Sequence, residues 1–523
     1  MRKSVFLFLL WLLPFAAPAQ QSWWVYFTDK NGSTFDPETY FAPEALQRRA
    51  AQGLPICDST DFPVAAAYIN AVAQIADSTG YSSRWLNAIG ITASEEQANR
   101  LRRLPFVRSV EPQNTWNWLP ASQPDTLSEW PFEGKAMPDD HLRPLQAKLF
   151  ADSGCKAKGI VIAVLDVGFR GTDKHDAFRK LYFNNRVRAT FDFVDNDWNV
   201  YENREDHGTM VLSCLAGYFN DQPLGMATEA TYLLARISRN YGNQYKGEER
   251  WVAALEWADQ QGANIINSSG GPNEESYFRE QIDGKTSVIT RASNLAARKG
   301  ILVVAAAGNN GEFEKGFLLP PSDADSALSV GAVGRNGLHE SYSASGPTWD
   351  FRRKPDLCAP GEAPVANGRG KYTLADGTSF ACPIVAGMAA CLMQRYPSIT
   401  VTGVADSLRR SCNRYPYYDY MHGYGIPQAG YFFGKAPQPK APCLDFVKAG
   451  DSLLVQLKPD FVPAFGATAP TMFYSLEDAR GIIYEYHVIQ PRSASPVILT
   501  AEQRAAGGRI HVYYEGYYAS YAF

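Results

Sequence analysis

The feature of this sequence that most constrains its fold is an alternation of apolar runs with amphipathic stretches between residues 147 and 434. Each run is rich in Val, Ile and Ala, which suits a strand that is buried on both faces of a parallel sheet. Helices are predicted between some of the runs, at Glu249–Gln260 and Thr286–Arg298. This pattern predicts a three-layer α/β domain with a mostly parallel central sheet. The expected strands are Gly159–Leu165, Thr231–Ile237, Ala263–Asn267, Ile301–Ala306 and Ala327–Val333.

The segment before this domain, residues 20–115, predicts a small α+β unit. We expect a helix at Ser94–Leu104 and strands at Trp24–Phe27, Arg84–Ile91 and Phe106–Val110. Residues 116–146 are rich in Trp and Pro and are interpreted as a linker. A chain of 523 residues is long enough for two to four domains, in agreement with this division.

The last region, residues 435–523, predicts a small β module, because Pro, Tyr and Val become frequent and helix signals fade. Strands are expected at Ser452–Leu457, Gly481–Ile489 and Arg509–Tyr514. Two roles are open for this module. It either binds a partner, a glycan or a cell surface, or it stabilises the α/β domain.

The N-terminus, residues 1–19, has the pattern of an export signal. Arg2 and Lys3 precede an apolar run over residues 5–15, and a small-residue cleavage pattern ends at Ala19. A membrane anchor is the alternative, but the run is short for a spanning helix. We therefore expect a secreted or cell-surface protein whose mature form has no transmembrane helix.

The chain has eight cysteines, and none shows the close paired spacing of a zinc site. An exported protein can form disulfides. The one pair that we expect is Cys412 with Cys443, which flank an aromatic and Pro-rich join. Cys214, Cys382 and Cys391 lie on apolar helical stretches and are expected to be buried thiols.

Three polar residues lie where α/β proteins place chemical groups. Asp166 ends the first apolar run, and sites form at the carboxyl ends of parallel strands. His207 directly precedes an apolar helix, and Gly208 beside it removes a side chain that would crowd the ring. Ser379 begins a long apolar helix, where free N–H groups and the helix dipole stabilise negative charge. Taken singly, each residue has a plainer interpretation as a turn, core or capping residue.

A fourth segment, Val303–Gly311, predicts a strand that runs into a Gly/Asn turn. Asn309 in this turn has a side-chain amide that could donate a hydrogen bond to an oxyanion. The small residues Ala306–Gly308 leave room for a substrate side chain. They permit a bulky or apolar residue there.

These four segments resemble the signatures of the subtilase family of serine peptidases. The signatures are a strand ending in Asp166, the HGT box at His207, the AAAGN turn at Asn309, and the GTSxAxPxVAG run around Ser379. The chain order Asp, His, Ser is that of subtilisin. The resemblance covers residues 147–434, and four segments in this order leave little room for chance.

The resemblance implies a secreted serine endopeptidase that hydrolyses peptide bonds through an acyl-enzyme intermediate. It implies that Asp166 orients the imidazole, that His207 is the general base and that Ser379 attacks the scissile carbonyl. Asn309 and the Ser379 backbone N–H would form the oxyanion hole. The strand edge that pairs with an extended peptide or protein substrate would be Ser268, Ser269 and Gly270.

The resemblance also implies that the N-terminal unit is a propeptide that inhibits the enzyme within the same molecule. Cleavage is expected between Asn114 and Pro144. The chemistry would require no cofactor. Structural calcium stays open, because the stretch Ala216–Met226 is short for the loop that carries calcium in subtilisins. An acidic stretch either binds a cation or consists of solvated loop carboxylates, and it contains Asp192, Asp195, Asp197 and Asp206.

Three residues depart from the family pattern, and one alternative function is open. Met210 replaces a second His, and Phe380 and Cys382 stand where Met and Ser are common, but no reacting group is lost. The net charge of −4 offers no broad basic surface for nucleic acid. A catalytically silent binding protein on the same scaffold would need a broken triad or oxyanion group, and all four residues are present.

Overall fold

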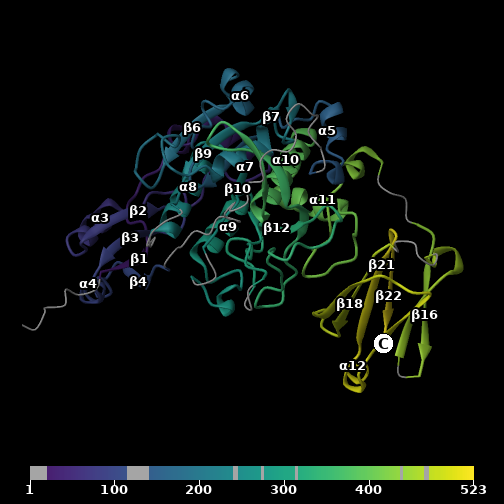
Figure 1. Cartoon of the computed structure of the whole chain (residues 1–523). Coiled ribbons are helices and arrows are strands. Elements are labelled where there is room, and N and C mark those ends of the chain that lie inside the picture. Colours follow the sequence, from purple (N-terminus) through teal and green to yellow (C-terminus); the bar gives the residue numbers. More distant parts are fainter. Residues whose placement is uncertain are drawn as a thin grey trace, which may run out of the picture.

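The computed structural model describes most of the chain, with the exception of several segments. The described residues are 20–114, 141–239, 246–272, 276–312, 316–435, 440–450, 452–463 and 470–523. The predicted export signal and most of the predicted linker lie outside these residues. Within them, no helix combines the length and the apolar character that crossing a membrane requires. Figure 1 shows an N-terminal unit, a central α/β domain and a C-terminal module in chain order.

The central domain is built on a seven-stranded sheet in the order β13-β12-β11-β10-β5-β9-β6, in which every pair is parallel. The five predicted strands are confirmed. The two edge strands β6 and β13 were not predicted, because β6 mixes polar and apolar residues and β13 is very short. The strands are β5 (Val161–Asp166), β6 (Val187–Asp192), β9 (Thr231–Arg236), β10 (Ile265–Ser268), β11 (Leu302–Ala306), β12 (Leu328–Val333) and β13 (Leu357–Pro360).

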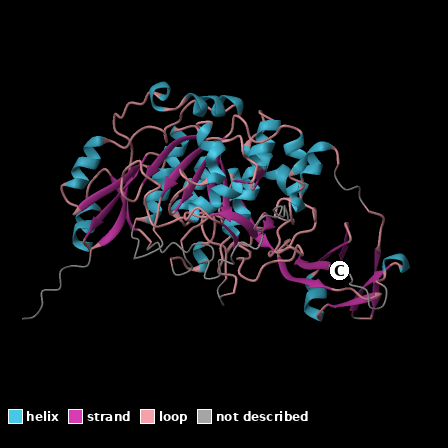
Figure 2. Ribbon diagram, turned by 45° about the horizontal axis from the view of Figure 1, so that its top comes forward, coloured by secondary structure: helices cyan, strands magenta, loops and turns pink. Residues whose placement is uncertain are grey.

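Helices cover both faces of this sheet, so the three-layer prediction is confirmed (Figures 1 and 2). Successive side chains of β5 point to opposite faces. Ile162 and Val164 pack in the core with α7 and α10, whereas Ala163 and Leu165 pack in the core with α8 and α9. The main helices are α7 (His207–Ala216), α8 (Gly247–Gln260), α9 (Val288–Arg298), α10 (Thr378–Arg395) and α11 (Val401–Ser411).

Smaller elements complete the central domain. Leu142 and Leu145 pack in its core, so the chain joins this domain before residue 147. The short helices are η1 (Arg143–Leu145), α5 (Lys148–Asp152), η2 (Asp176–Phe178), α6 (Arg179–Phe183), η3 (Arg279–Gln281) and η4 (Ala429–Phe433). Two hairpins are formed by β7 (Tyr218–Phe219) with β8 (Gln222–Pro223) and by β14 (Glu362–Ala366) with β15 (Tyr372–Asp376).

The N-terminal unit is an antiparallel sheet, in the order β2-β3-β1-β4, with four helices. The predicted strand Arg84–Ile91 is confirmed for residues 88–91, which belong to β3, and is wrong for residues 84–87, which form the turn between β2 and β3 with Asn87 in the left-handed region. β2 is polar and therefore gave no strand signal. The elements are β1 (Gln21–Phe27), α1 (Pro37–Tyr40), α2 (Pro43–Ala51), α3 (Ala66–Ala73), β2 (Ser78–Ser83), β3 (Ala88–Ala93), α4 (Glu95–Leu101) and β4 (Val107–Pro112).

This unit packs its sheet against α8 and α9 of the central domain. Trp24 and Trp85 lie in one apolar cluster with Trp251 and Leu255 of α8. Around this cluster, buried ion pairs join the two units, including Arg49 with Asp259 at 2.9 Å. The contact therefore has an apolar centre and a buried charged border.

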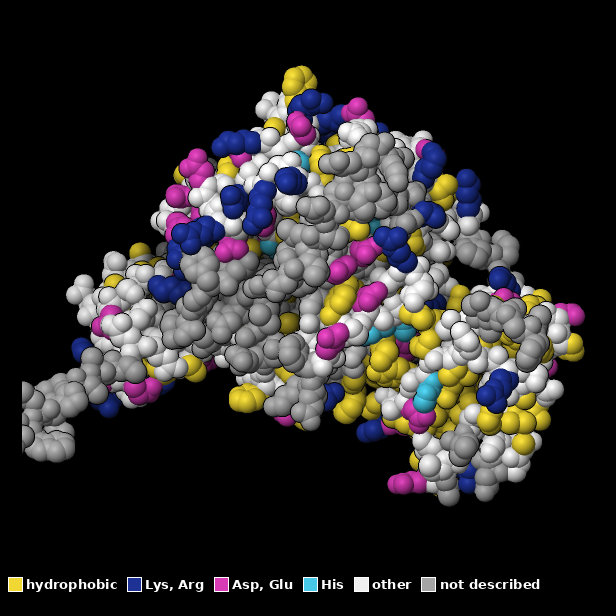
Figure 3. Space-filling model, viewed as in Figure 1, with side chains coloured by type: hydrophobic (Ala, Val, Ile, Leu, Met, Phe, Trp, Pro, Cys, Tyr) yellow, Lys and Arg dark blue, Asp and Glu magenta, His cyan; other side chains and the backbone are white. Residues whose placement is uncertain are grey.

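The C-terminal module has two antiparallel sheets, β16-β17-β20 and β19-β18-β21-β22, around one apolar core. The three predicted strands are confirmed, and four further strands and two short helices accompany them in the described residues. Hydrophobic side chains are frequent on its viewed face, at the lower right of Figure 3. The elements are β16 (Leu444–Ala449), β17 (Ser452–Leu457), η5 (Pro459–Phe461), β18 (Met472–Asp478), β19 (Ile483–Ile489), β20 (Ala494–Ile498), α12 (Ala501–Ala506), β21 (Gly508–Tyr514) and β22 (Tyr517–Ala522).

All eight cysteines lie in the described part of the chain, and each is a free thiol. The expected bridge between Cys412 and Cys443 is therefore wrong. The physical reason is their location, since Cys412 belongs to the core of the central domain and Cys443 to the core of the C-terminal module. Cys214, Cys382 and Cys391 are buried thiols, as predicted.

Candidate functional site

Asp166 and His207 form a buried hydrogen-bonded pair at the carboxyl end of the central sheet. Asp166 is the last residue of β5, and His207 is the first residue of α7. His207 Nδ1 lies 2.8 Å from Asp166 Oδ1, which also accepts a hydrogen bond of 2.8 Å from the Val167 backbone N–H. Gly208 permits this approach, because a Cβ atom at that position would lie 2.6 Å from the carbonyl oxygen of Gly168.

The surroundings of His207 push its pKa in two directions. Burial lowers the pKa of the imidazole, because a charged ring loses its hydration. The Asp166 carboxylate raises it, through both its charge and its hydrogen bond, and Asp206 and Glu205 raise it further. The effect of the carboxylates exceeds that of burial, so the pKa of His207 lies above its usual value.

Ser379 lies in the first turn of α10, beside this pair. Gly377 caps the helix with a φ of 146°, a conformation that side chains rarely adopt. The Ser379 hydroxyl donates to the backbone carbonyl of Ser269. His207 Nε2 is buried without a hydrogen-bond partner among the described residues, and the imidazole lies 5.9 Å, between ring centroids, from the ring of Phe380.

Asn309 is held by the residue that precedes Ser379. Its Oδ1 accepts hydrogen bonds from the backbone N–H of Thr378 at 3.0 Å and from Thr378 Oγ1 at 2.8 Å. Because only the carbonyl end of an amide can accept from an N–H, these bonds fix which end of Asn309 faces Thr378. The Nδ2 end is thereby directed away from Thr378. Thr378 has no predicted role in the sequence pattern, and its place between Gly377 and Ser379 is the one signal for it.

The segment Ser268–Gly270 continues from the end of β10 past Ser379. Ser268 Oγ accepts from Trp251 Nε1 and donates to the Gly270 carbonyl oxygen, both at 3.1 Å. Asn267 Nδ2 donates to Ser269 Oγ at 2.8 Å. Both serine side chains are therefore used inside the protein, and the segment can offer a ligand only its backbone groups.

Cys382 is the other potential nucleophile near this site. Its thiol is fully buried one turn after Ser379 and lies 3.4 Å from the carbonyl oxygen of Val304. Burial raises the pKa of this thiol well above its usual value, so it stays protonated and unreactive.

The carboxylates of the predicted acidic stretch form hydrogen bonds and ion pairs with other groups of the protein. Arg236 Nη1 lies 2.6 Å from Asp192 and 2.7 Å from Asp195. Asp197 accepts from the Asn199 N–H at 2.8 Å, and Asp206 accepts from the Gly368 N–H at 3.0 Å. The interpretation as solvated carboxylates is thus wrong for Asp192, which is buried. Within the described ranges, no three His, Cys, Asp or Glu side chains are grouped so that they could hold a metal ion.

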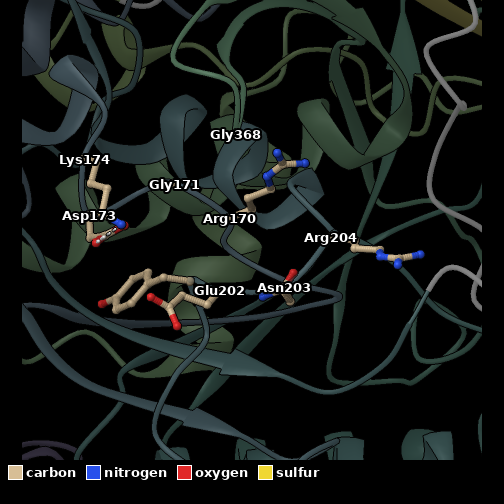
Figure 4. A pocket seen from close by; sticks show the side chains of 9 residues that line it. Arg170, Gly171, Asp173, Lys174, Glu202, Asn203, Arg204 and Gly368 are labelled. Carbon is tan, nitrogen blue, oxygen red and sulfur yellow. Dashed lines mark ion pairs between the residues drawn. The ribbon is translucent and has the colours of Figure 1, made fainter.

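A polar cavity of about 480 Å³ is lined by residues of the loop that follows Asp166 and of the loop that precedes His207. The Arg170 N–H donates to the Glu205 carbonyl oxygen at 3.1 Å, which ties the two loops together. In Figure 4, Arg170 and Arg204 extend away from the Asp173–Lys174 ion pair at the other end of the cavity. Ser379 does not line this cavity.

Comparison with known proteins gives two family matches. Residues 157–425 match the model of the subtilase family, and residues 22–128 match that of the peptidase S8 propeptide domain of Bacteroidota. Subtilisin E of Bacillus subtilis is 26% identical over 330 residues, which cover 62% of this chain and 75% of the relative. Alkaline elastase YaB of a Bacillus species is 29% identical over 270 residues, which cover 51% of this chain and 63% of the relative.

Proposed function

Because the chain belongs to the subtilase family and is a serine endopeptidase with a propeptide domain, we propose that Asp166, His207 and Ser379 are its catalytic triad. The observation that carries this proposal is the buried hydrogen bond of 2.8 Å between His207 and Asp166. It leaves His207 Nε2 as the one ring nitrogen that can accept a proton, and that nitrogen has no other partner.

In the proposed reaction, the Ser379 hydroxyl turns from the Ser269 carbonyl toward His207 Nε2. The proton moves to Nε2 as Ser379 Oγ attacks the scissile carbonyl carbon. The imidazolium, stabilised by Asp166, then protonates the leaving amine, and an acyl-enzyme remains on Ser379. Water, deprotonated by His207, attacks the ester and releases the second product. Such serines often lack the aligned hydrogen bond to the base until substrate binds.

We assign the oxyanion hole to Asn309 Nδ2 and the Ser379 backbone N–H. The two hydrogen bonds from Thr378 to Asn309 Oδ1 support this role, because they orient the amide before substrate arrives. A preorganised donor costs no rearrangement as negative charge develops. Loss of such a donor lowers kcat by about 10²–10³, a value known for subtilisin itself.

Peptide substrates would bind along Ser268–Gly270 by main-chain hydrogen bonds. The internal use of both serine side chains supports this, because only backbone groups are left to meet a substrate. Backbone pairing tolerates many substrate sequences. Specificity must then come from the pockets that receive the substrate side chains.

We further propose that the full-length chain is an exported, inactive precursor. Asp166, His207 and Ser379 are all buried in it. The export pattern at residues 1–19 and the propeptide domain support secretion followed by cleavage between Asn114 and Pro144. Subtilases need no cofactor for catalysis, and structural calcium stays open for this chain.

The test is the substitution Ser379→Ala, measured by hydrolysis of casein and by N-terminal sequencing of the secreted protein. Activity should fall by about 10⁶, the loss known for subtilisin itself, and processing should stop. Cys382→Ser is the matched control and should retain activity. Proteolysis by the purified Ser379→Ala variant would refute the assignment. Absence of labelling of the wild-type protein by a fluorophosphonate would instead favour a silent scaffold.

A further inference from the structure

The two chain segments that leave β10 and β11 both contact the first turn of α10 at Ser379, and the space between these segments is called the crevice below. These strands are neighbours in the sheet, and Ser268 pairs with Ala305. Beyond them, Ser269 accepts the hydrogen bond from Ser379, and the Gly308 N–H lies 3.4 Å from Thr378 Oγ1. Residues 269–271 and 307–309 therefore flank the serine from two sides.

This inference rests on the proposed function, which places the scissile carbonyl between Ser379 Oγ and Asn309. The residue that supplies this carbonyl, P1, would then lie next to both flanking segments. If the substrate backbone pairs with Ser268–Gly270, the P1 side chain points into the crevice between the segments. The depth of the crevice thus decides which side chains fit at P1.

Leu319 occupies this crevice. Its Cγ and Cδ1 atoms lie 3.0 Å from where a Cβ atom of Gly308 would be. On the other side, its Cβ lies 3.9 Å, and the Pro320 carbonyl oxygen 2.4 Å, from where a Cβ atom of Gly271 would be. Only glycine is accommodated at position 271 without a shift of the Pro320 backbone. The Leu319 side chain is 7% exposed.

The Leu319 backbone is fixed on both sides. Its N–H donates to the Ala307 carbonyl oxygen at 3.0 Å. Its own carbonyl oxygen accepts from the Ser322 N–H at 3.0 Å and from Ser322 Oγ at 2.7 Å. The preceding residues Phe317 and Leu318 are buried in the same small core as Leu319. The backbone of Leu319 therefore cannot move away from the crevice unless these hydrogen bonds break.

We propose that Leu319 closes the P1 pocket and restricts this peptidase to bonds that follow small residues such as Gly, Ala and Ser. This proposal differs from the expectation that the small residues 306–308 permit a bulky or apolar P1 side chain, because a residue from a later loop fills the space. An aromatic P1 ring would have to displace the Leu319 side chain. Substrates that differ by one methylene in a hydrophobic pocket differ in kcat/KM by about 10–200-fold. An aromatic ring is larger than a methyl group by much more than one methylene.

The test compares chromogenic tetrapeptide substrates that differ only in Ala or Phe at P1, with enzyme activated from the full chain. Wild type should prefer Ala by at least about 100-fold in kcat/KM. Leu319→Ala should raise kcat/KM for the Phe substrate by about 10–100-fold and change that for the Ala substrate by less than about fivefold. Leu318→Ala is the matched control in the same loop and should keep the wild-type preference.

Two results would overturn the proposal. One is equal or better cleavage of the Phe substrate by wild type, which a peptide-library profile checks without any variant. The other is an unchanged preference in a folded Leu319→Ala enzyme. If that variant fails to fold, Leu319→Val serves in its place, with a smaller gain expected. Failure of the proposed triad is distinguishable from failure of the Leu319 proposal. If the triad is wrong, the Ser379→Ala variant still cleaves the Ala substrate.

Discussion

At the scale of the residue, the chemistry depends on how His207 is held. The buried Asp166 carboxylate accepts a hydrogen bond from His207 Nδ1–H and thereby sets the tautomer in which Nε2 is the proposed base. The same carboxylate raises the pKa of His207 against the effect of burial. Orientation and basicity of the ring therefore share one cause.

Activity should consequently fall as the pH drops through a His207 pKa above the usual value near 6.5, because only the neutral imidazole accepts a proton. Asp166→Asn should lower kcat by about 10⁴, the effect known for an equivalent substitution in another serine protease, since Asn favours the wrong tautomer. The residual activity should titrate at lower pH, because the attraction that raises the pKa is gone. The measurement is kcat/KM between pH 5 and 10. An unshifted acid limb in Asp166→Asn would contradict this account of the pKa.

At the scale of the element, α8 joins the central domain to the N-terminal unit. One side of the helix carries Trp251 and Leu255 into an apolar cluster. Another side buries carboxylates under the N-terminal sheet. Glu256 accepts hydrogen bonds from the backbone N–H groups of Arg84 at 2.9 Å and Trp85 at 3.2 Å. Burial raises the pKa of Glu256, and also that of Glu248, to about 7.

Docking of the N-terminal unit should therefore weaken as the pH rises. A carboxyl group whose pKa is raised in the docked state stabilises docking fully when the pH is below its usual pKa near 4.5. This stabilisation is lost as the pH rises through about 7. In the uncleaved Ser379→Ala chain, thermal unfolding should show a less stable N-terminal unit at pH 8.5 than at pH 5.5. Adding Glu256→Gln should reduce this difference, because the amide does not ionise. Adding Glu96→Gln, at an exposed position of α4, should leave the difference unchanged. An equal difference in stability between pH 5.5 and pH 8.5 in the two variants would contradict the prediction.

At the scale of the whole molecule, the C-terminal module is docked on the central domain through an aromatic interface. Tyr513 OH donates to the Asn413 carbonyl oxygen at 2.6 Å, and Arg353 pairs with Glu477 at 3.1 Å. Tyr418 and Tyr420 are buried in one cluster with Ile483 of the module. Their loop is bonded to β13, since the Cys358 N–H donates to the Gly425 carbonyl oxygen at 3.0 Å. This arrangement favours a stabilising role for the module, while binding of a partner or surface stays a prediction.

A chain that ends at Gly434 should therefore have a lower Tm than the full chain, because Tyr418 and Tyr420 become exposed to solvent when the module is removed. In the full chain, Tyr513→Phe removes one hydrogen bond, which contributes about 1 kcal/mol. The expected fall in Tm is about 2–4 °C. Scanning calorimetry measures both. An unchanged Tm in the shortened chain would contradict the stabilising role and leave surface binding as the better explanation.

Much of the fold was predictable because it is encoded locally. The five central strands are apolar on both faces, so their runs stand out, whereas the polar strand β2 and the edge strands β6 and β13 have no such signal. The bond between His207 and Asp166 brings together two of the predicted site residues. The pairing of Cys412 with Cys443 failed, because nearness in sequence does not reveal that the two residues belong to different cores.

The sequence by itself determined the five apolar strands of the central sheet, and which polar residues follow the ends of these strands. The physical reason is that the period of apolar residues reflects local geometry. Only the tertiary structure decided that Leu319 enters the crevice beside Gly308, and that Glu256 lies under Arg84 and Trp85. These contacts join segments that are distant along the chain, so their distances arise from packing and no local pattern records them.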